Sequence, residues 1–215
     1  MLNATQLRSS LGHQRASNGG FALFEVLVTM VIIAFALVGL AGASLRADVA
    51  ELESYQRIQA LELLQDMVAR MNANRGDSAG TTSSSNPTNP AVLDACYAGI
   101  QVGTGYSGTP TCTAGTAQQN QQAILDIQGW DATLKGSAEV DGSGSKLGAM
   151  IGAIGCIDLI DATNHVYIVS VHWQGLASTA APQGVLCNNG GATGKYGNEK
   201  LHRVVSTVLQ IGKLI

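Results

Sequence analysis

The chain has 215 residues, of which 13% are charged and 26 are glycine, and its formal net charge is −3 at pH 7. This length accommodates one ordinary domain with an appendage rather than two full domains. The positive charges are scattered, with no cluster of Lys and Arg to neutralise phosphates, so we expect no nucleic-acid partner. The four cysteines are an even number, which is compatible with two disulfides and therefore with an oxidising compartment.

The N-terminal part of the chain combines a basic segment with a long apolar run. Residues 1–20 carry basic side chains but no acidic ones, and Phe21–Leu45 follows with a single charge, Glu25. As a helix this run rises about 37 Å, enough to cross a hydrocarbon core of about 30 Å. The positive-inside rule then places the N-terminus in the cytoplasm and exports the rest of the chain.

The helical pattern continues beyond the apolar run. The run is longer than the apolar core of a secretory signal peptide, which spans roughly 7–15 residues, and neither Pro nor Gly interrupts residues 43–75. The sequence therefore predicts one helix over 21–75, with 21–45 as its membrane-spanning part. Apolar residues recur every three or four positions along the later part: Leu45, Val49, Leu52, Tyr55, Ile58, Leu61, Leu64, Val68 and Met71. We expect this stripe to pack against the protein's own domain rather than to form a dedicated partner-binding coil.

The start of the apolar run carries a family resemblance. The stretch GFALFEVLV, Gly20 to Val28, resembles the class III signal of type IV pilins and type II secretion pseudopilins. The resemblance implies that a prepilin peptidase removes the leader 1–20 by cleaving between Gly20 and Phe21, and that Phe21 is then N-methylated. It also implies that Glu25, the fifth residue of the mature chain, governs assembly by facing the α-amine of a neighbouring subunit.

Physical chemistry gives a reason for the carboxylate in this position. An ionised group at membrane depth is costly and usually has a partner, and cleavage would create an amine on Phe21 within one turn of Glu25. The helix dipole adds about 0.3–1 kcal/mol for an acid in the first turn. The alternative is a glutamate that snorkels to the interface without function, which its short side chain disfavours.

Two further segments refine the resemblance. ALVGLAG, Ala36 to Gly42, and YIVSVHWQG, Tyr167 to Gly175, resemble the minor pilins of the pilus-modification (PilV) family. On this resemblance we expect a structural subunit, not an enzyme, that takes part in type IV pilus assembly and priming without a cofactor. Its partners would be the prepilin peptidase, other minor pilins, the major pilin and the inner membrane, which it spans once with a periplasmic head. The alternative is a pseudopilin of a type II secretion system.

The spacing Gly39-x-x-x-Ala43 inside the apolar run leaves two interpretations open. Small residues four apart allow membrane helices to approach closely. Glycine in a helix also permits local unwinding.

The remainder of the chain divides into a loop region and a head. Residues 76–90 contain two prolines and no large apolar side chain, which is typical of a flexible loop, and we assign 76–116 to this Ser/Thr/Gly-rich region. The head, 117–215, contains a helix, a hairpin and a last strand, predicted over 118–135, 147–160 with 165–173, and 201–215. An α+β fold results, with a small antiparallel sheet on the outer half of the long helix. This arrangement agrees with the pilin-like fold that the resemblance implies.

Alternation within the hairpin predicts the orientation of its side chains. Tyr167, Val169, Val171 and Trp173 share one face of the second arm, so His172 lies on the other. We expect His172 at the surface. His165, His172 and His202 lie on separate elements with no nucleophile motif beside them, so no catalytic residue is predicted.

The cysteines allow three pairings. We favour Cys96–Cys112 and Cys156–Cys187 because closing the shorter loops costs less entropy. Zinc is the competing interpretation, but neither C-x-x-C nor H-x₃-H spacing is present, so no metal is expected.

A literal G-x-G-x-x-G match spans residues 103–108. It does not lie between a predicted strand and a predicted helix, and Thr109-Pro110 follows it. We interpret it as a loop inside the first disulfide rather than as a nucleotide site.

Overall fold

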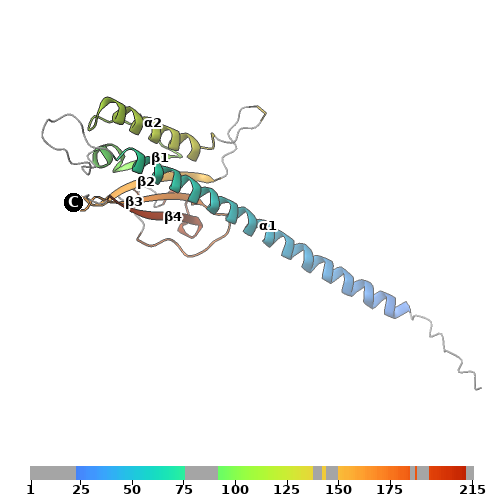
Figure 1. Cartoon of the computed structure of the whole chain (residues 1–215). Coiled ribbons are helices and arrows are strands. Elements are labelled where there is room, and N and C mark those ends of the chain that lie inside the picture. Colours follow the sequence, from blue (N-terminus) through green and yellow to red (C-terminus); the bar gives the residue numbers. More distant parts are fainter. Residues whose placement is uncertain are drawn as a thin grey trace, which may run out of the picture. The chain divides into compact units, whose positions relative to one another are not determined.

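The structure, a computed structural model, describes residues 23–75, 92–137, 142–143, 150–184, 187 and 194–211. The elements in chain order are α1 (Leu23–Ala73), π-helix η1 (Leu93–Tyr97), β1 (Ile100–Gly103), α2 (Ala117–Leu134), β2 (Ile151–Asp161), β3 (Val166–Gln174), the 3₁₀ turn η2 (Glu199–Leu201) and β4 (His202–Gln210) (Figure 1). The predicted long helix, the second helix and the α+β class are confirmed.

The chain forms two compact units, Met1–Arg46 and Ala47–Ile215, so α1 contributes to both. We call Leu23–Arg46 the apolar half of α1 and Ala47–Ala73 its head half. From here on, the head means the whole second unit, Ala47–Ile215, which holds the head half of α1 and all the remaining elements.

The head contains one four-stranded antiparallel sheet in the order β1-β2-β3-β4. The β2–β3 hairpin and the last strand β4 occur where the sequence predicts them. The hairpin loop begins after Asp161, whose carboxylate accepts hydrogen bonds from the backbone N–H groups of Thr163 (2.8 Å) and Asn164 (3.0 Å). These bonds close the loop locally, as an Asx turn does.

The hydrophobic core lies on one face of this sheet. Alternation places Tyr167, Val169, Val171 and Trp173 of β3 on that face, each 0–3% exposed, as the sequence predicts. Trp130 of α2 is fully buried, and a Cβ on Gly155 would lie only 2.5 Å from its ring. Glycine at this position of β2 therefore lets the indole lie directly on the sheet.

Both helices contribute to the same core. The buried residues of the head half of α1 are Gln56, Ala60, Leu64, Met67 and Met71, and those of α2 are Ala123, Asp126, Ile127, Trp130 and Leu134. The apolar members of both sets belong to one cluster with the sheet residues. Figure 1 shows α2 and this part of α1 beside the sheet. The head is therefore a two-layer arrangement of helices on an antiparallel sheet.

The region 76–116, expected to be a flexible loop, is structured in its second part. Residues 92–116 contain η1 and the edge strand β1. Four of their side chains have no exposed surface: Val92, Leu93, Tyr97 and Val102. Residues 76–91 lie outside the described part of the chain. The strand escaped prediction because four residues flanked by glycines give almost no periodic signal.

The expected stripe on α1 divides into a buried and an exposed part. Leu64 and Met71 are buried, but Leu52 is 53% exposed and Ile58 is 60% exposed. A spacing of three residues advances 300° around a helix with 3.6 residues per turn. The series from Val49 to Leu61 therefore winds away from the face that meets the head, and the expectation that the whole stripe packs on the protein's own domain is wrong.

Candidate functional site

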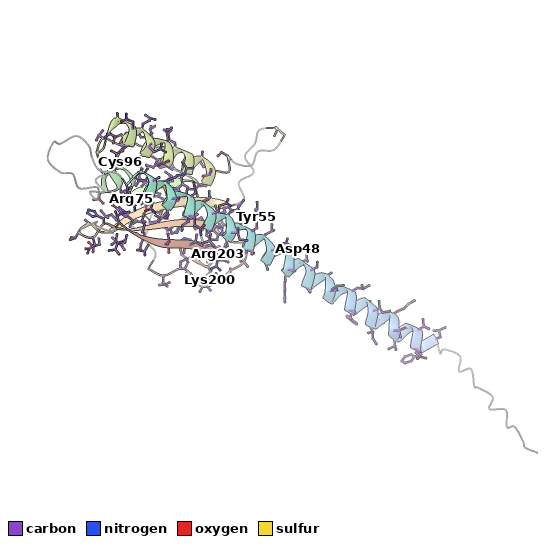
Figure 2. The ribbon with its side chains drawn as sticks, viewed as in Figure 1. Asp48, Tyr55, Arg75, Cys96, Lys200 and Arg203 are labelled. Carbon is purple, nitrogen blue, oxygen red and sulfur yellow. A yellow bond between two sulfur atoms is a disulfide. The ribbon has the colours of Figure 1, made fainter. Side chains whose placement is uncertain are left out.

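The apolar half of α1 is an apolar surface that no other described part of the protein covers. Every residue from 23 to 46 is exposed except Val28, which is half-buried. Large side chains are among the most exposed: Phe24 (74%), Phe35 (75%) and Val38 (72%). Figure 2 shows side chains projecting from opposite sides of this half. α1 is long and apolar enough to cross a membrane.

Glu25 lies in the first turn of α1. Its side chain is exposed, and it is the single charged residue between Leu23 and Leu45. In contrast, Thr29 of the same half satisfies its hydroxyl within the helix by donating to the Val26 carbonyl oxygen at 2.8 Å. The predicted cleavage and methylation residues, Gly20 and Phe21, lie outside the described residues.

The small residues of the apolar half are accessible to a partner. A Cβ added to Gly39 or Gly42 would meet nothing within 4 Å, and both residues lie inside an unbroken α-helix. The helix therefore does not unwind at these glycines. Their open backbone surface fits the interpretation in which another helix approaches closely.

A second exposed apolar surface lies on the head half of α1. It consists of Leu52 (53%), Tyr55 (48%), Ile58 (60%) and Leu61 (39%). We call these four residues the helical apolar surface. Single exposed apolar residues are ordinary on proteins, but a series of four along one helix is a candidate contact surface.

The head half is fixed to α2 by polar contacts in addition to packing. The Trp130 indole Nε1 donates to the Leu63 carbonyl oxygen at 3.0 Å. The Arg70 guanidinium bonds to Asp66 at 2.8 Å and to the buried Asp126 at 3.2 Å. Asp126 also accepts from the Tyr97 hydroxyl at 2.7 Å. Burial, together with this carboxylate, raises the pKa of Tyr97, so the phenol stays protonated and remains a donor.

Glu53 fixes the opposite end of the head half. Its Oε1 accepts from the backbone N–H groups of Leu176 (3.0 Å) and Ala177 (2.8 Å) and from Arg203 Nη2 of β4 (3.2 Å). Desolvation raises the pKa of Glu53, but these donors together outweigh it and hold the pKa below its usual value. Figure 2 labels Arg203 on the sheet beside this part of α1. A hollow of about 420 Å³ lies here, lined in part by Glu53, Trp173 and Arg203.

The four cysteines form the two disulfides that we expect from the sequence. Cys96 pairs with Cys112, and Cys156 pairs with Cys187. The Cα–Cα distances are 5.1 Å and 5.3 Å, within the usual range for a disulfide. The first disulfide joins η1 to the segment before α2, and the second joins β2 to Cys187.

The second face of the sheet contains a small buried polar cluster that sequence reasoning missed. His172, expected at the surface, has no exposed area, and His202 is 6% exposed. The prediction of its face was right, but Cys187 and Tyr196 pack on that face, in one buried cluster with Ile154 and Cys156 of β2. Alternation along a strand shows on which face of the sheet a residue lies. It does not show which later segments of the chain pack over that face.

Hydrogen bonds connect the two histidines to each other. His172 Nδ1 lies 2.8 Å from His202 Nε2, and His202 Nδ1 lies 3.1 Å from a Glu199 carboxylate oxygen. Burial, and to a lesser extent the neighbouring His202, lower the pKa of His172 to about 4, so its ring is neutral near pH 7. The third histidine, His165, lies elsewhere and bonds to Asp94 at 3.1 Å.

The G-x-G-x-x-G match begins at the end of β1. Gly103 is the last residue of that strand, and the next helix, α2, begins only at Ala117. The Gly103 backbone N–H donates to Asp131 Oδ1 at 2.8 Å. The segment is therefore a connection between β1 and α2, and it is not the short strand-to-helix turn that carries a phosphate.

A scan against protein-family models finds no match for this chain. Searches of the curated proteins and of the solved structures find no match either.

Proposed function

We propose that this protein is a minor pilin, a structural subunit that takes part in the assembly and priming of a type IV pilus. The observation that carries the proposal is the division of α1. One half is apolar on all sides and unburied, and the other continues as part of the core of an α+β head. A subunit whose helix enters first a membrane and then a bundle of like helices needs this division.

In this proposal, Glu25 determines how the apolar halves of neighbouring subunits align. A carboxylate in an apolar segment is expensive unless a positive group faces it. Cleavage after Gly20 supplies such a group, the α-amine of Phe21, and in an assembly the amine of a neighbouring subunit can pair with Glu25. The charge then favours one axial register between subunits, because other registers leave both charges unpaired.

The helical apolar surface extends the contact between subunits into the head. Leu52, Tyr55 and Ile58 are exposed on the head half although their neighbours Gln56 and Ala60 are buried. Burying apolar area is worth about 25 cal/mol per Å². We propose that the α1 helices of adjacent subunits cover these side chains.

The remaining features fit an exported head. Arg8 and Arg15 precede the span and favour a cytoplasmic N-terminus in the inner membrane. Two disulfides are typical of proteins that reach an oxidising compartment such as the periplasm. The prepilin peptidase, other minor pilins and the major pilin are the partners that this function requires.

Gene deletion with complementation tests the proposal. Cells that lack the protein should lose most surface pili and twitching motility, and the wild-type gene should restore both. A gene that encodes Glu25→Val should yield an inserted and cleaved chain that enters pili at least tenfold less well. Glu51→Gln is the matched control, because Glu51 is an exposed acid on the same helix outside the apolar run, and it should restore pili fully.

The same strains distinguish the alternative. Normal incorporation of the Glu25→Val chain would contradict the assembly role of the carboxylate. Lost exoprotein secretion with intact pili would overturn the pilin assignment in favour of a type II secretion pseudopilin.

A further inference from the structure

β4 forms one edge of the sheet, and no other strand of the described residues pairs with its outer side (Figure 1). The hydrogen bonds just beyond its two ends show which of its backbone groups point outward. The Gly175 N–H donates to the Leu201 carbonyl oxygen at 2.7 Å, and the Ile211 N–H donates to that of His165 at 3.2 Å. Both bonds continue the unbroken β3–β4 register. Because such bonds recur at every second residue of an antiparallel pair, the odd-numbered residues of β4 bond to β3.

The even-numbered residues of β4 therefore direct their N–H and C=O groups away from the sheet. At the start of the strand this edge is closed, because the Arg203 guanidinium donates to the carbonyl oxygens of Lys200 (3.0 Å) and His202 (3.4 Å). Farther along, the outward backbone groups have no hydrogen-bond partner in the described part of the chain at four positions, Val204, Ser206, Val208 and Gln210. The Val208 side chain is 61% exposed. The open edge thus spans most of the strand.

The opposite edge of the sheet, β1, is protected where β4 is not. β1 has only four residues, and the Gly103 N–H donates to Asp131 of α2. Natural sheets commonly blunt an exposed edge with a short strand, a proline, a bulge or a lysine. β4 has nine residues and pairs with β3 without a bulge, and residues 204–210 contain neither proline nor a charged side chain. The β4 edge is therefore suited to receive another strand.

A hollow adjoins the first open position of this edge. The hollow of about 420 Å³ beside Glu53 is also lined by Val204. Trp173, 3% exposed, contributes to its lining. Arg203 is paired with Glu53 at 3.2 Å, whereas the exposed Arg57 has no ion pair with any acidic group that the structure describes. The hollow therefore carries an unpaired positive charge beside open backbone groups.

We propose that the outer edge of β4 receives an extended strand of another protein, which places an acidic side chain opposite Arg57. The open groups repeat every second residue, at about 6.8 Å, and an extended backbone offers complementary groups at this spacing. An acidic side chain in the hollow pairs with the charge that the described head leaves unpaired. The mode of docking follows from the head alone, and only the identity of the partner, a neighbouring pilus subunit, rests on the proposed function.

A second copy of this chain, paired through the same strand, does not meet the charge requirement. β4 contains no acidic residue, so a pair of β4 strands brings no carboxylate to Arg57 of either copy. The charge therefore favours a strand from a different chain.

Proline at an outward position tests the edge without breaking the sheet. Ser206→Pro removes one outward N–H, whereas Val205 and Thr207 keep their bonds to β3. Ser206→Ala keeps the N–H and is the matched control. Arg57→Glu reverses the charge at the hollow. Lys200→Glu makes the same reversal at an exposed residue that does not line the hollow.

Photocrosslinking of the full chain in intact cells provides the readout. A benzoylphenylalanine in place of Val208 should give one discrete adduct with another pilus subunit, identified by mass spectrometry. Ser206→Ala and Lys200→Glu should leave the yield of this adduct unchanged. Ser206→Pro and Arg57→Glu should each lower it at least fivefold. Thermal unfolding of the purified chains controls for folding, and the exposed Arg57 keeps the test valid if the proline destabilises the head.

Three results would overturn the proposal. The first is the absence of any adduct between chains, and the second is an adduct with a second copy of this chain alone. The third is a yield that neither Ser206→Pro nor Arg57→Glu lowers relative to its control. An adduct that shows the expected response to the variants but contains a protein outside the pilus would support the strand site and contradict the pilin assignment, so the two failures are distinguishable.

Discussion

The apolar half and the head half of α1 belong to one uninterrupted helix but differ in what covers them. In Leu23–Arg46 no side chain is buried, whereas Ala47–Ala73 buries five residues against the head. The apolar half presents large hydrophobic side chains all round, and the head half mixes them with charged ones. The two halves therefore form one continuous helix but differ in the contacts that can stabilise them.

The difference shows what each half needs from its surroundings. Most helical stability in proteins comes from packing of a face rather than from intrinsic propensity. The head half obtains that packing from α2 and the sheet. The apolar half has no such packing partner among the described residues, and in the function we propose its apolar contacts come from lipid and from other subunits.

The largest expected effect comes from the residue that fastens the head half to α2. Trp130→Ala removes a fully buried indole and its bond to the Leu63 carbonyl oxygen. We expect a loss of about 3–5 kcal/mol in the free energy of unfolding of the head. Calorimetry of the detergent-solubilised chain measures it.

Phe35→Ala is the matched control for this comparison. Phe35 is an aromatic residue of the apolar half and is 75% exposed. Its replacement should change the unfolding free energy of the head by less than about 0.5 kcal/mol. Equal effects of the two substitutions would mean that the halves are not energetically distinct.

A smaller and pH-dependent effect is expected at Glu53. The lowered pKa means that its carboxylate binds a proton less readily in the folded chain than in the unfolded one. Its contribution to stability is therefore present above the ordinary value of 4.5 and is lost as the pH falls through the folded pKa. Glu53→Gln should cost about 1 kcal/mol at pH 7.

The pH profile provides the check. Thermal unfolding between pH 7 and pH 3 should show a difference between wild type and Glu53→Gln that shrinks as the pH falls. Glu62→Gln, an exposed acid on the same helix, should follow the wild type throughout. A difference that grows with acidification would contradict the assigned ion pair with Arg203.

The smallest effect on stability is expected on the helical apolar surface. Ile58 is 60% exposed, so Ile58→Ser should change the free energy of unfolding by less than about 0.5 kcal/mol. We expect the same substitution to reduce incorporation into pili, because in the proposed assembly this side chain contacts another subunit. Quantitative immunoblotting of sheared pili measures incorporation, and a destabilised head or normal incorporation would contradict this role.

The parts of the fold that were predicted share a strong periodic signal. α1, α2, the β2–β3 hairpin and β4 each span nine residues or more, long enough for apolar spacing to distinguish a helix from a strand. β1 has four residues and lies in a Gly-rich stretch, 99–108. Its pairing with β2 depends on tertiary contacts that no local pattern reports.

The candidate sites also divide into those that the sequence alone reveals and those that it does not. Glu25 stands out because a charge inside an apolar run is visible in the sequence alone. The burial of His172 depends on Cys187 and Tyr196, which follow it by 15 and 24 residues in the chain and cover its face only after folding. Part of the α1 stripe is exposed because residues spaced three apart rotate around the helix and do not keep to one face.

The most direct test of the pilin assignment is the N-terminus of the mature chain. Intact-mass measurement and N-terminal sequencing of the protein purified from membranes should give a chain that starts at Phe21 and carries one methyl group on its α-amine. In cells without prepilin peptidase the chain should keep residues 1–20. A membrane chain that still starts at Met1 when the peptidase is present, or a cut near residue 45 that removes the apolar half, would contradict the account.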